Sequence, residues 1–204
     1  MKLPQLELCL SENTRRRVPT GDSILRAAVA MIFRPGANSN LELLMIHRAE
    51  HPKDPWSGHM AFPGGRIDSI DQSATHGAIR EVQEELSLNL ETARLLGELE
   101  PLTVPPRVLK TEMWVHAFVF YADQLSQPKP NEEVQAVHWF DFSRFESSEG
   151  RGEFQYHGHG YDMLLPEVSL DGCRIWGMSL RLIDDLVDRA QCPWRDGSHP
   201  TKEA

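Results

Sequence analysis

FPGGRIDSIDQSATHGAIREVQEEL, Phe62 to Leu86, is the stretch that decides the fold of this chain. Its first part carries two glycines, Gly64 and Gly65, which let a backbone turn tightly and approach a metal ion or a phosphate closely. Its second part predicts a helix, because apolar residues recur four residues apart and form one stripe, at Ala78, Val82 and Leu86. We expect Asp71 or Ser73 to cap the start of this helix.

Three glutamates share one face of the predicted helix. Glu81, Glu84 and Glu85 stand at positions i, i+3 and i+4, so their carboxylates project toward a common point. Each like-charge pair destabilises a helix by about 0.2–0.5 kcal/mol unless a cation compensates, and hard divalent ions with oxygen ligands do this well. Arg80 is able to pair with Glu84 one turn on. Such a triple taken alone is usually a solvated acidic face, so the glycines upstream decide its meaning.

The whole stretch resembles the motif of the Nudix hydrolase family. That motif has a glycine, five residues, a glutamate, seven residues and then REUXEEXGU, with U aliphatic. Here Gly65 is followed by five residues and Asp71, and REVQEELSL runs from Arg80 to Leu88. The chain departs from the motif twice, because eight residues separate Asp71 from Arg80 and Ser87 replaces the usual glycine. The longer spacing favours Asp71 as a helix cap over a ligand, and Ser87 is less suited than glycine to a left-handed helix end.

The resemblance implies an α+β fold, a Nudix-like α/β/α sandwich with a mixed sheet and the metal-binding helix packed beside it. The hydrophobic patterns predict a second, closing helix over Met178 to Ala190 and strands over Ile24 to Phe33, Leu41 to His47, Leu95 to Val104, Glu112 to Tyr121 and Val134 to Phe140. We assign residues 1–22 to an N-terminal extension, residues 23–190 to a Nudix hydrolase domain and residues 191–204 to a C-terminal tail.

Other segments look like the coenzyme A pyrophosphatase-like branch of that family. HRAEHPKDPWSGHMAFPGG, His47 to Gly65, partly reproduces a basic motif of the branch that ends in FPGG. Arg48 matches its first basic residue and Lys53 stands for the second, although the spacing to the motif's glycine is one residue longer. NEEVQAVHWFDF, Asn131 to Phe142, and IWG, Ile175 to Gly177, are also similar to that branch.

The resemblance implies a metal site and its catalytic groups. The expected ligands of Mg²⁺ or Mn²⁺ are the carboxylates of the triple and one backbone carbonyl: Glu81, Glu84, Glu85 and Gly65. The expected catalytic residues are Arg80, Glu84 and Glu85. The base that activates water belongs either to the glutamate triple or to the loop Asn131 to Val134, which contains Glu132 and Glu133.

Basic residues that flank the motif are expected to grip substrate phosphates. We name Arg48, Lys53 and Arg66 for this role, arginine as a planar fork and lysine as a point charge. Trp56, in the loop between them, is expected to plug that loop against the core rather than to stack on an adenine.

The implied activity is hydrolysis of a diphosphate linkage in a nucleoside-diphosphate-linked metabolite, with coenzyme A or its derivatives first. ADP-ribose or a nucleotide sugar is the second substrate class, and a non-catalytic nucleotide-binding module is a further alternative. Another enzyme class uses the same fold to isomerise isopentenyl diphosphate, with a core cysteine taking part. The cysteines here argue against that class, because all three fall outside the strands that would line the cleft: Cys9, Cys173 and Cys192.

Composition and charge limit the partners of this chain. With 204 residues it fits one domain with modest extensions, and 40% hydrophobic and 25% charged residues are ordinary for a globular protein. A formal charge of −9 disfavours nucleic acid, and the longest apolar run contains Arg26, so we expect no membrane span. We see no secretory signal and no paired cysteine motif, so we expect a cytoplasmic protein, and a homodimer is allowed.

Overall fold

The structure is a computed structural model that describes residues 1–11, 24–52, 54, 56–104, 111–158 and 161–191. Its helices are α1 (Leu3–Ser11), α2 (Ala74–Leu86) and α4 (Gly177–Gln191), with short 3-10 turns at Ala37–Ser39 and Phe142–Arg144. Its strands are β1 (Leu25–Pro35), β2 (Leu41–Arg48), β3 (Met60–Ala61), β4 (Gly64–Arg66), β5 (Arg94–Glu98), β6 (Leu102–Val104), β7 (Met113–Tyr121), β8 (Val134–Asp141), β9 (Arg151–Gly158), β10 (Tyr161–Leu170) and β11 (Cys173–Trp176).

Eight of these strands form one mixed sheet. Its order is β3-β2-β1-β7-β5, with β4 paired to β1, β6 to β7 and β8 to β2. β1 and β7 are parallel, in register from Leu25 opposite Met113 to Phe33 opposite Tyr121. The other pairings in this sheet are antiparallel. The mixed sheet expected from the sequence is therefore confirmed.

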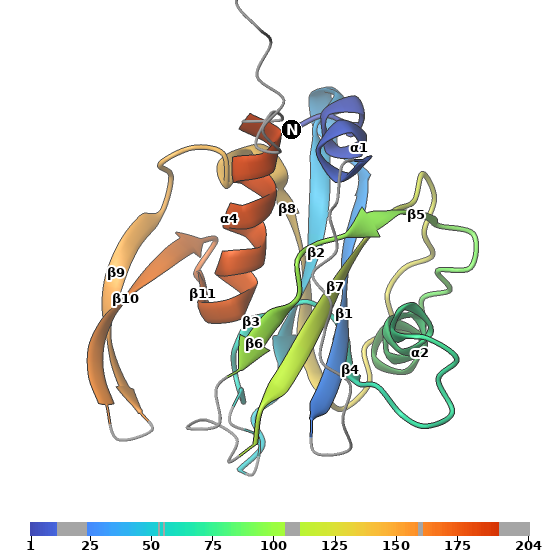
Figure 1. Cartoon of the computed structure of the whole chain (residues 1–204). Coiled ribbons are helices and arrows are strands. Elements are labelled where there is room, and N and C mark those ends of the chain that lie inside the picture. Colours follow the sequence, from blue (N-terminus) through green and yellow to red (C-terminus); the bar gives the residue numbers. More distant parts are fainter. Residues whose placement is uncertain (12–23, 53, 55, 105–110, 159–160, 192–204) are drawn as a thin grey trace, which may run out of the picture.

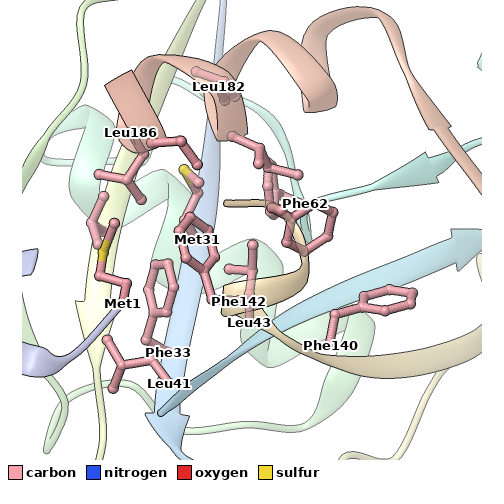
Figure 2. Packing of buried hydrophobic residues seen from close by; sticks show 14 of the residues in the cluster. Met1, Met31, Phe33, Leu41, Leu43, Phe62, Phe140, Phe142, Leu182 and Leu186 are labelled. Atoms are coloured by element: carbon pink, nitrogen blue, oxygen red, sulfur yellow. The ribbon is translucent and has the colours of Figure 1, made fainter. Parts of the chain in front are cut away.

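Helices cover both faces of this sheet, which makes an α/β/α sandwich (Figure 1). Alternate residues of β1 explain why, because Ala30 and Ile32 are buried against α2 whereas Met31 and Phe33 are buried on the opposite face. On that opposite face they pack with residues of α1 and α4, among them Leu186 (Figure 2). The predicted α+β fold with a helix beside the sheet is present.

Three elements differ from the sequence expectations. A continuous strand expected over Leu95 to Val104 is divided into β5 and β6, and Pro101, which has no backbone N–H to donate, lies in the break. α1 was not expected, and it packs against α4 and β5. The small sheet β11-β10-β9 was not expected either, and it attaches to the core through buried residues of β10 and β11.

Among the described helices none is both long enough and apolar enough to cross a lipid bilayer.

Candidate active site

Ser73, and not Asp71, caps the start of α2. The Ser73 side chain accepts a hydrogen bond from the backbone N–H of His76 at 3.1 Å. The side chain of Asp71 is shielded from solvent and binds Arg80 instead, with Arg80 Nε 3.1 Å from Oδ1 and Nη2 3.0 Å from Oδ2. These hydrogen bonds hold the pKa of the Asp71 carboxyl well below its usual range. Asp71 therefore anchors the arginine of the motif rather than the helix backbone.

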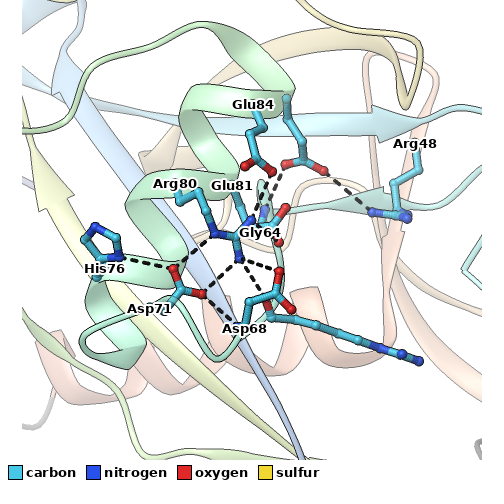
Figure 3. Close-up of polar contacts among 10 residues, drawn as sticks. Arg48, Gly64, Asp68, Asp71, His76, Arg80, Glu81 and Glu84 are labelled. Carbon is cyan, nitrogen blue, oxygen red and sulfur yellow. Dashed lines mark hydrogen bonds and ion pairs between the residues drawn. The ribbon is translucent and has the colours of Figure 1, made fainter.

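Arg80 lies at the centre of the hydrogen-bond network on this helix (Figure 3). Besides Asp71, its Nη1 donates to Glu81 Oε1 at 3.1 Å and to Glu84 Oε2 at 3.0 Å. Its Nη2 also donates to the backbone carbonyl of Arg66 at 2.9 Å. The contact between Arg80 and Glu84 that the spacing suggested is present. One guanidinium thus joins two of the three glutamates to the glycine-bearing strand β4.

Glu85 is the buried member of the glutamate triple. Its side chain is 3% exposed, and its Oε2 accepts the backbone N–H of Gly64 at 2.9 Å. Among the described residues, its other oxygen, Oε1, receives no hydrogen bond, and the cationic nitrogen nearest to it is Arg48 Nη1 at 3.9 Å. Burial raises the pKa of the Glu85 carboxyl to about 8. A carboxylate held in this position is stabilised by a cation.

Two glycines allow β4 to approach both β1 and α2. Gly64 has a φ of +148°, and a Cβ there would lie 2.3 Å from the carbonyl oxygen of Ala28 on β1. At Gly65 an added Cβ would lie 2.5–2.8 Å from the carboxylate atoms of Glu81. Only a residue without a side chain lets the backbone of β4 and the Glu81 carboxylate face each other so closely.

These residues fit a hard divalent cation in the type of donor atom that they offer. Glu81 is half-buried, and burial raises its carboxyl pKa, which a bound cation would reverse. Within the described part of the chain no three His, Cys, Asp or Glu side chains converge as they stand. The physical reason is that Arg80 draws Glu81 and Glu84 to itself while Gly64 holds one oxygen of Glu85. The space left by Gly65 and the lone Oε1 of Glu85 are the features that suit a metal ion.

The predicted phosphate-binding residues have different positions. Arg48, at the end of β2, donates from Nε and Nη2 to Asp54 Oδ2 at 3.1 and 2.6 Å and lies beside Glu85. Arg66 is exposed on β4, and its contact with the network is through its backbone carbonyl, which accepts from Arg80 at 2.9 Å. Lys53 lies outside the described residues. Trp56 packs against a small core cluster at the ends of β1, β6 and β7, in agreement with its expected role as a plug.

Two further acidic residues lie near this network, Asp54 beside Arg48 and Glu133 beside Glu81 and Glu85. Asp54 was not singled out, because nothing in the irregular loop after β2 indicated that it would reach Arg48. Glu133 was one of two loop candidates, and it lies close enough to Glu81 and Glu85 to raise both carboxyl pKa values. Its loop is fixed to the end of α2, since the Asn131 N–H donates to the Glu85 carbonyl at 2.9 Å.

The fold places this chain in the class of α/β/α sandwich proteins. Its candidate site consists of carboxylates on helix α2 that face the glycine-bearing strand β4. The NUDIX domain model matches residues 24–157 of this chain. The protein belongs to the NUDIX domain family, as its motif predicted.

Two mammalian enzymes and one bacterial Nudix hydrolase are similar to parts of this chain. The chain is 34% identical over 139 residues to the mitochondrial coenzyme A diphosphatase NUDT8 of Mus musculus and 31% identical over 138 residues to that of Homo sapiens. Each match covers 67% of this chain, which spans 64% of the mouse and 58% of the human relative. An uncharacterized Nudix hydrolase, NudL of Yersinia pestis, is 42% identical over 79 residues, or 38% of this chain and 37% of that one.

Solved structures share the fold at low sequence identity. The NUDIX domain of Shewanella oneidensis NrtR, complexed with ADP ribose, has a TM-score of 0.56 at 16% identity and covers 83% of this chain and 90% of that one. A MutT/nudix family protein from Enterococcus faecalis has a TM-score of 0.55 at 15% identity, with coverage of 86% and 65%. These likenesses support the fold and nothing further.

Proposed function

We propose that this protein hydrolyses a diphosphate linkage in a nucleoside-diphosphate-linked metabolite, with Mg²⁺ or Mn²⁺ as cofactor, and that coenzyme A or a derivative is the substrate. The observation that carries the proposal is the buried Glu85 carboxylate, with one oxygen on Gly64 and the other beside Arg48. It lies on the same helix as two further carboxylates at the spacing of the Nudix motif.

In this mechanism the chain's own residues bind and orient the reacting groups. Glu81, Glu84 and Glu85, with the carbonyl of Gly65, would hold the cation through oxygen atoms. A cation held there would neutralise charge on the diphosphate and make the attacking water more acidic. Arg80 fixes two of these carboxylates through the hydrogen bonds described above, which is positioning rather than contact with substrate.

Arginine side chains would bind the phosphates of the substrate, and one carboxylate would act as the base. Arg48 and Arg66 flank the network and suit the phosphate oxygens; Lys53 remains a prediction. A carboxylate must also accept the proton of the attacking water. Glu133 is a candidate beside the triple, because its charge acts on Glu81 and Glu85 and its side chain is exposed.

Coenzyme A is placed first because the two mammalian relatives carry that substrate in their names. ADP-ribose or a nucleotide sugar is the second candidate, because these metabolites carry the same kind of diphosphate linkage. A non-catalytic nucleotide-binding module is the third. The cytoplasmic location and the homodimer stay predictions, and the named mammalian relatives are mitochondrial.

The decisive experiment is a hydrolysis screen of the purified protein over coenzyme A, ADP-ribose, nucleotide sugars and dinucleoside polyphosphates, each with Mg²⁺ or Mn²⁺. We expect release of a phosphopantetheine product and 3′,5′-ADP from coenzyme A and loss of activity with a chelator. Hydrolysis of ADP-ribose alone would select the second candidate. Binding of all four without turnover would select the non-catalytic module.

Matched variants assign the site within the same screen. Glu85→Gln preserves the shape of the side chain, and we expect turnover to fall at least about 100-fold, whereas Gln83→Ala on the exposed side of α2 should leave it unchanged. Glu133→Gln compared with its neighbour Glu132→Gln tests the base. A full rate for Glu85→Gln at saturating Mg²⁺ would remove this site from the reaction.

A further inference from the structure

Asp54 and Glu85 share one arginine. Arg48 directs Nε and Nη2 toward Asp54 Oδ2, at 3.1 and 2.6 Å, and Nη1 toward Glu85 Oε1, at 3.9 Å. The first two are hydrogen bonds, whereas the third distance is too long for one. The guanidinium is therefore bound to Asp54 and only adjacent to Glu85.

The position of Asp54 is fixed from its other side. Asp54 Oδ1 accepts the backbone N–H of Trp56 at 3.0 Å, and the side chain of Trp56 packs against the core cluster that includes Val104 and Met113. Asp54 and Arg48 are mostly shielded, with side chains 18% and 22% exposed, so solvent weakens their attraction less than at an open surface. A link from the core through Trp56 and Asp54 thus reaches Arg48.

Without this link, Glu85 is the one close anionic partner of Arg48 that remains among the described residues. Glu85 Oε1 receives no hydrogen bond from the described residues, and a short movement would bring Arg48 Nη1 within hydrogen-bonding distance of it. A guanidinium bound there would use the oxygen that the proposed metal site needs, and it would place a positive charge against an incoming cation.

We infer that Asp54 is a positioning residue that holds Arg48 away from Glu85 and so keeps the Glu85 carboxylate available to a divalent cation. This inference rests on the proposed function, because it concerns the same site. It predicts that Asp54 acts on metal affinity only through Arg48, and that Arg48 competes with the metal whenever Asp54 is neutralised.

The test is direct titration of the intact protein with Mn²⁺ alone, with free Mn²⁺ measured by electron paramagnetic resonance. Asp54→Asn keeps an oxygen for the Trp56 N–H but loses the charge that binds Arg48. We expect its Mn²⁺ affinity to fall about tenfold, the effect of about one pKa unit of charge interaction. The matched control is Glu50→Gln, which removes an equal charge from the same loop, where Glu50 binds Ser57 and not Arg48, and should change affinity by less than about twofold.

The double variant Asp54→Asn/Arg48→Gln decides between a positioning role and a general charge effect. We expect it to bind Mn²⁺ as tightly as Arg48→Gln alone, because no guanidinium remains to compete. An equal loss from Asp54→Asn in both backgrounds, or equal effects of Asp54→Asn and Glu50→Gln, would overturn the inference. Thermal unfolding of each variant checks that it folds, and Asp54→Glu should recover part of the lost affinity.

Failure of the inference is distinguishable from failure of the proposed function. If Mn²⁺ binds the wild-type protein, Glu85→Gln abolishes binding and Asp54→Asn has no effect, only the inference is wrong. If no Mn²⁺ binding depends on Glu85, the proposed metal site is wrong and the inference falls with it.

Discussion

Glu85 affects both the stability of the fold and the proposed chemistry. A carboxylate buried this deeply is favourable only when a partner stabilises its charge, and Gly64 supplies one hydrogen bond while Arg48 stays at 3.9 Å. The protein therefore folds with a group that is costly to ionise in the absence of metal. Such sites are common where a protein binds an ion or performs catalysis, because the bound ion supplies the missing partner.

Glu85→Gln should flatten the pH dependence of folding stability in the metal-free protein. Burial raises the pKa of Glu85 to about 8, so below this pH the native state keeps a proton that the unfolded chain releases near its ordinary pKa. Because the native state binds the extra proton, the free energy of unfolding falls as pH rises from about 4.5 to about 8, on the order of 1 kcal/mol per pH unit. Glutamine has no titrating proton in this range.

The measurement is urea unfolding of both proteins in a chelating buffer at several pH values across that window. The stability of the wild type minus that of the variant should decrease steadily toward the alkaline side. If the stability of the two proteins changed in parallel with pH, burial would not raise the pKa of the Glu85 carboxyl.

The residues that the sequence could identify are those with local spacing. Glu81, Glu84 and Arg80 follow from one helical period, and their contacts join residues at most one turn apart. The contacts of Glu85 with Gly64 and Arg48 could not be read in this way, since they join α2 to two different strands. Asp54 lies in a loop without a period, so its partner became apparent only in three dimensions.

At the scale of elements, the two adjacent glycines of β4 are expected to have different roles. Gly64 should matter for stability and Gly65 for turnover. Gly64→Ala should destabilise the protein by at least about 2 kcal/mol, because φ is +148° and the new Cβ would meet the backbone of β1. Gly65→Ala should cost less than about 1 kcal/mol, since the nearest atoms that the new Cβ meets are the end of the Glu81 side chain, but it should lower turnover at least about tenfold. Denaturant unfolding and steady-state rates on the two variants check this, and an equal stability loss in both would contradict it.

The C-terminal end of α2 carries a serine where glycine is better suited. Ser87 adopts the left-handed conformation, φ 53° and ψ 30°, and its N–H donates to the Gln83 carbonyl at 3.0 Å. Ser87→Gly should stabilise the protein by about 0.5–1 kcal/mol, because it removes the strain of a side chain in that conformation. Ser87→Ala serves as the control and should bring no gain in unfolding midpoint. Stabilisation by alanine equal to that by glycine would point to another cause.

Regular hydrophobic patterns predicted the central elements, and their absence hid the others. β1, β2, β7, β8 and α4 lie within a few residues of the predicted ranges. β9 and β10 alternate charged and apolar residues weakly, and Pro166 interrupts the pattern of β10. α1 has nine residues, too few for a helix that is stable on its own, so its helical state depends on the helices and strands around it.

At the scale of the whole molecule, α1 is part of the core. Leu6 is fully buried in the cluster that contains α4, whereas Leu8 on the same helix is 54% exposed. Leu6→Ala should lower the free energy of unfolding by about 2–5 kcal/mol, and Leu8→Ala should change it by less than about 0.5 kcal/mol. Urea unfolding of the pair tests whether the predicted N-terminal extension contributes to the stability of the domain. Similar small effects from both would show that α1 is dispensable.

The parallel pairing of β1 with β7 determines when this protein can fold during synthesis. Leu25 pairs with Met113 and Phe33 with Tyr121, and the glycine strand and the acidic helix lie between them in the chain. A ladder that joins such distant segments closes slowly, because the intervening chain must lose its freedom first. The ribosome must therefore release the chain beyond Tyr121 before the centre of the sheet can form. Until then α2 has no complete sheet to pack on. Its apolar residues stay exposed, where chaperones can bind them.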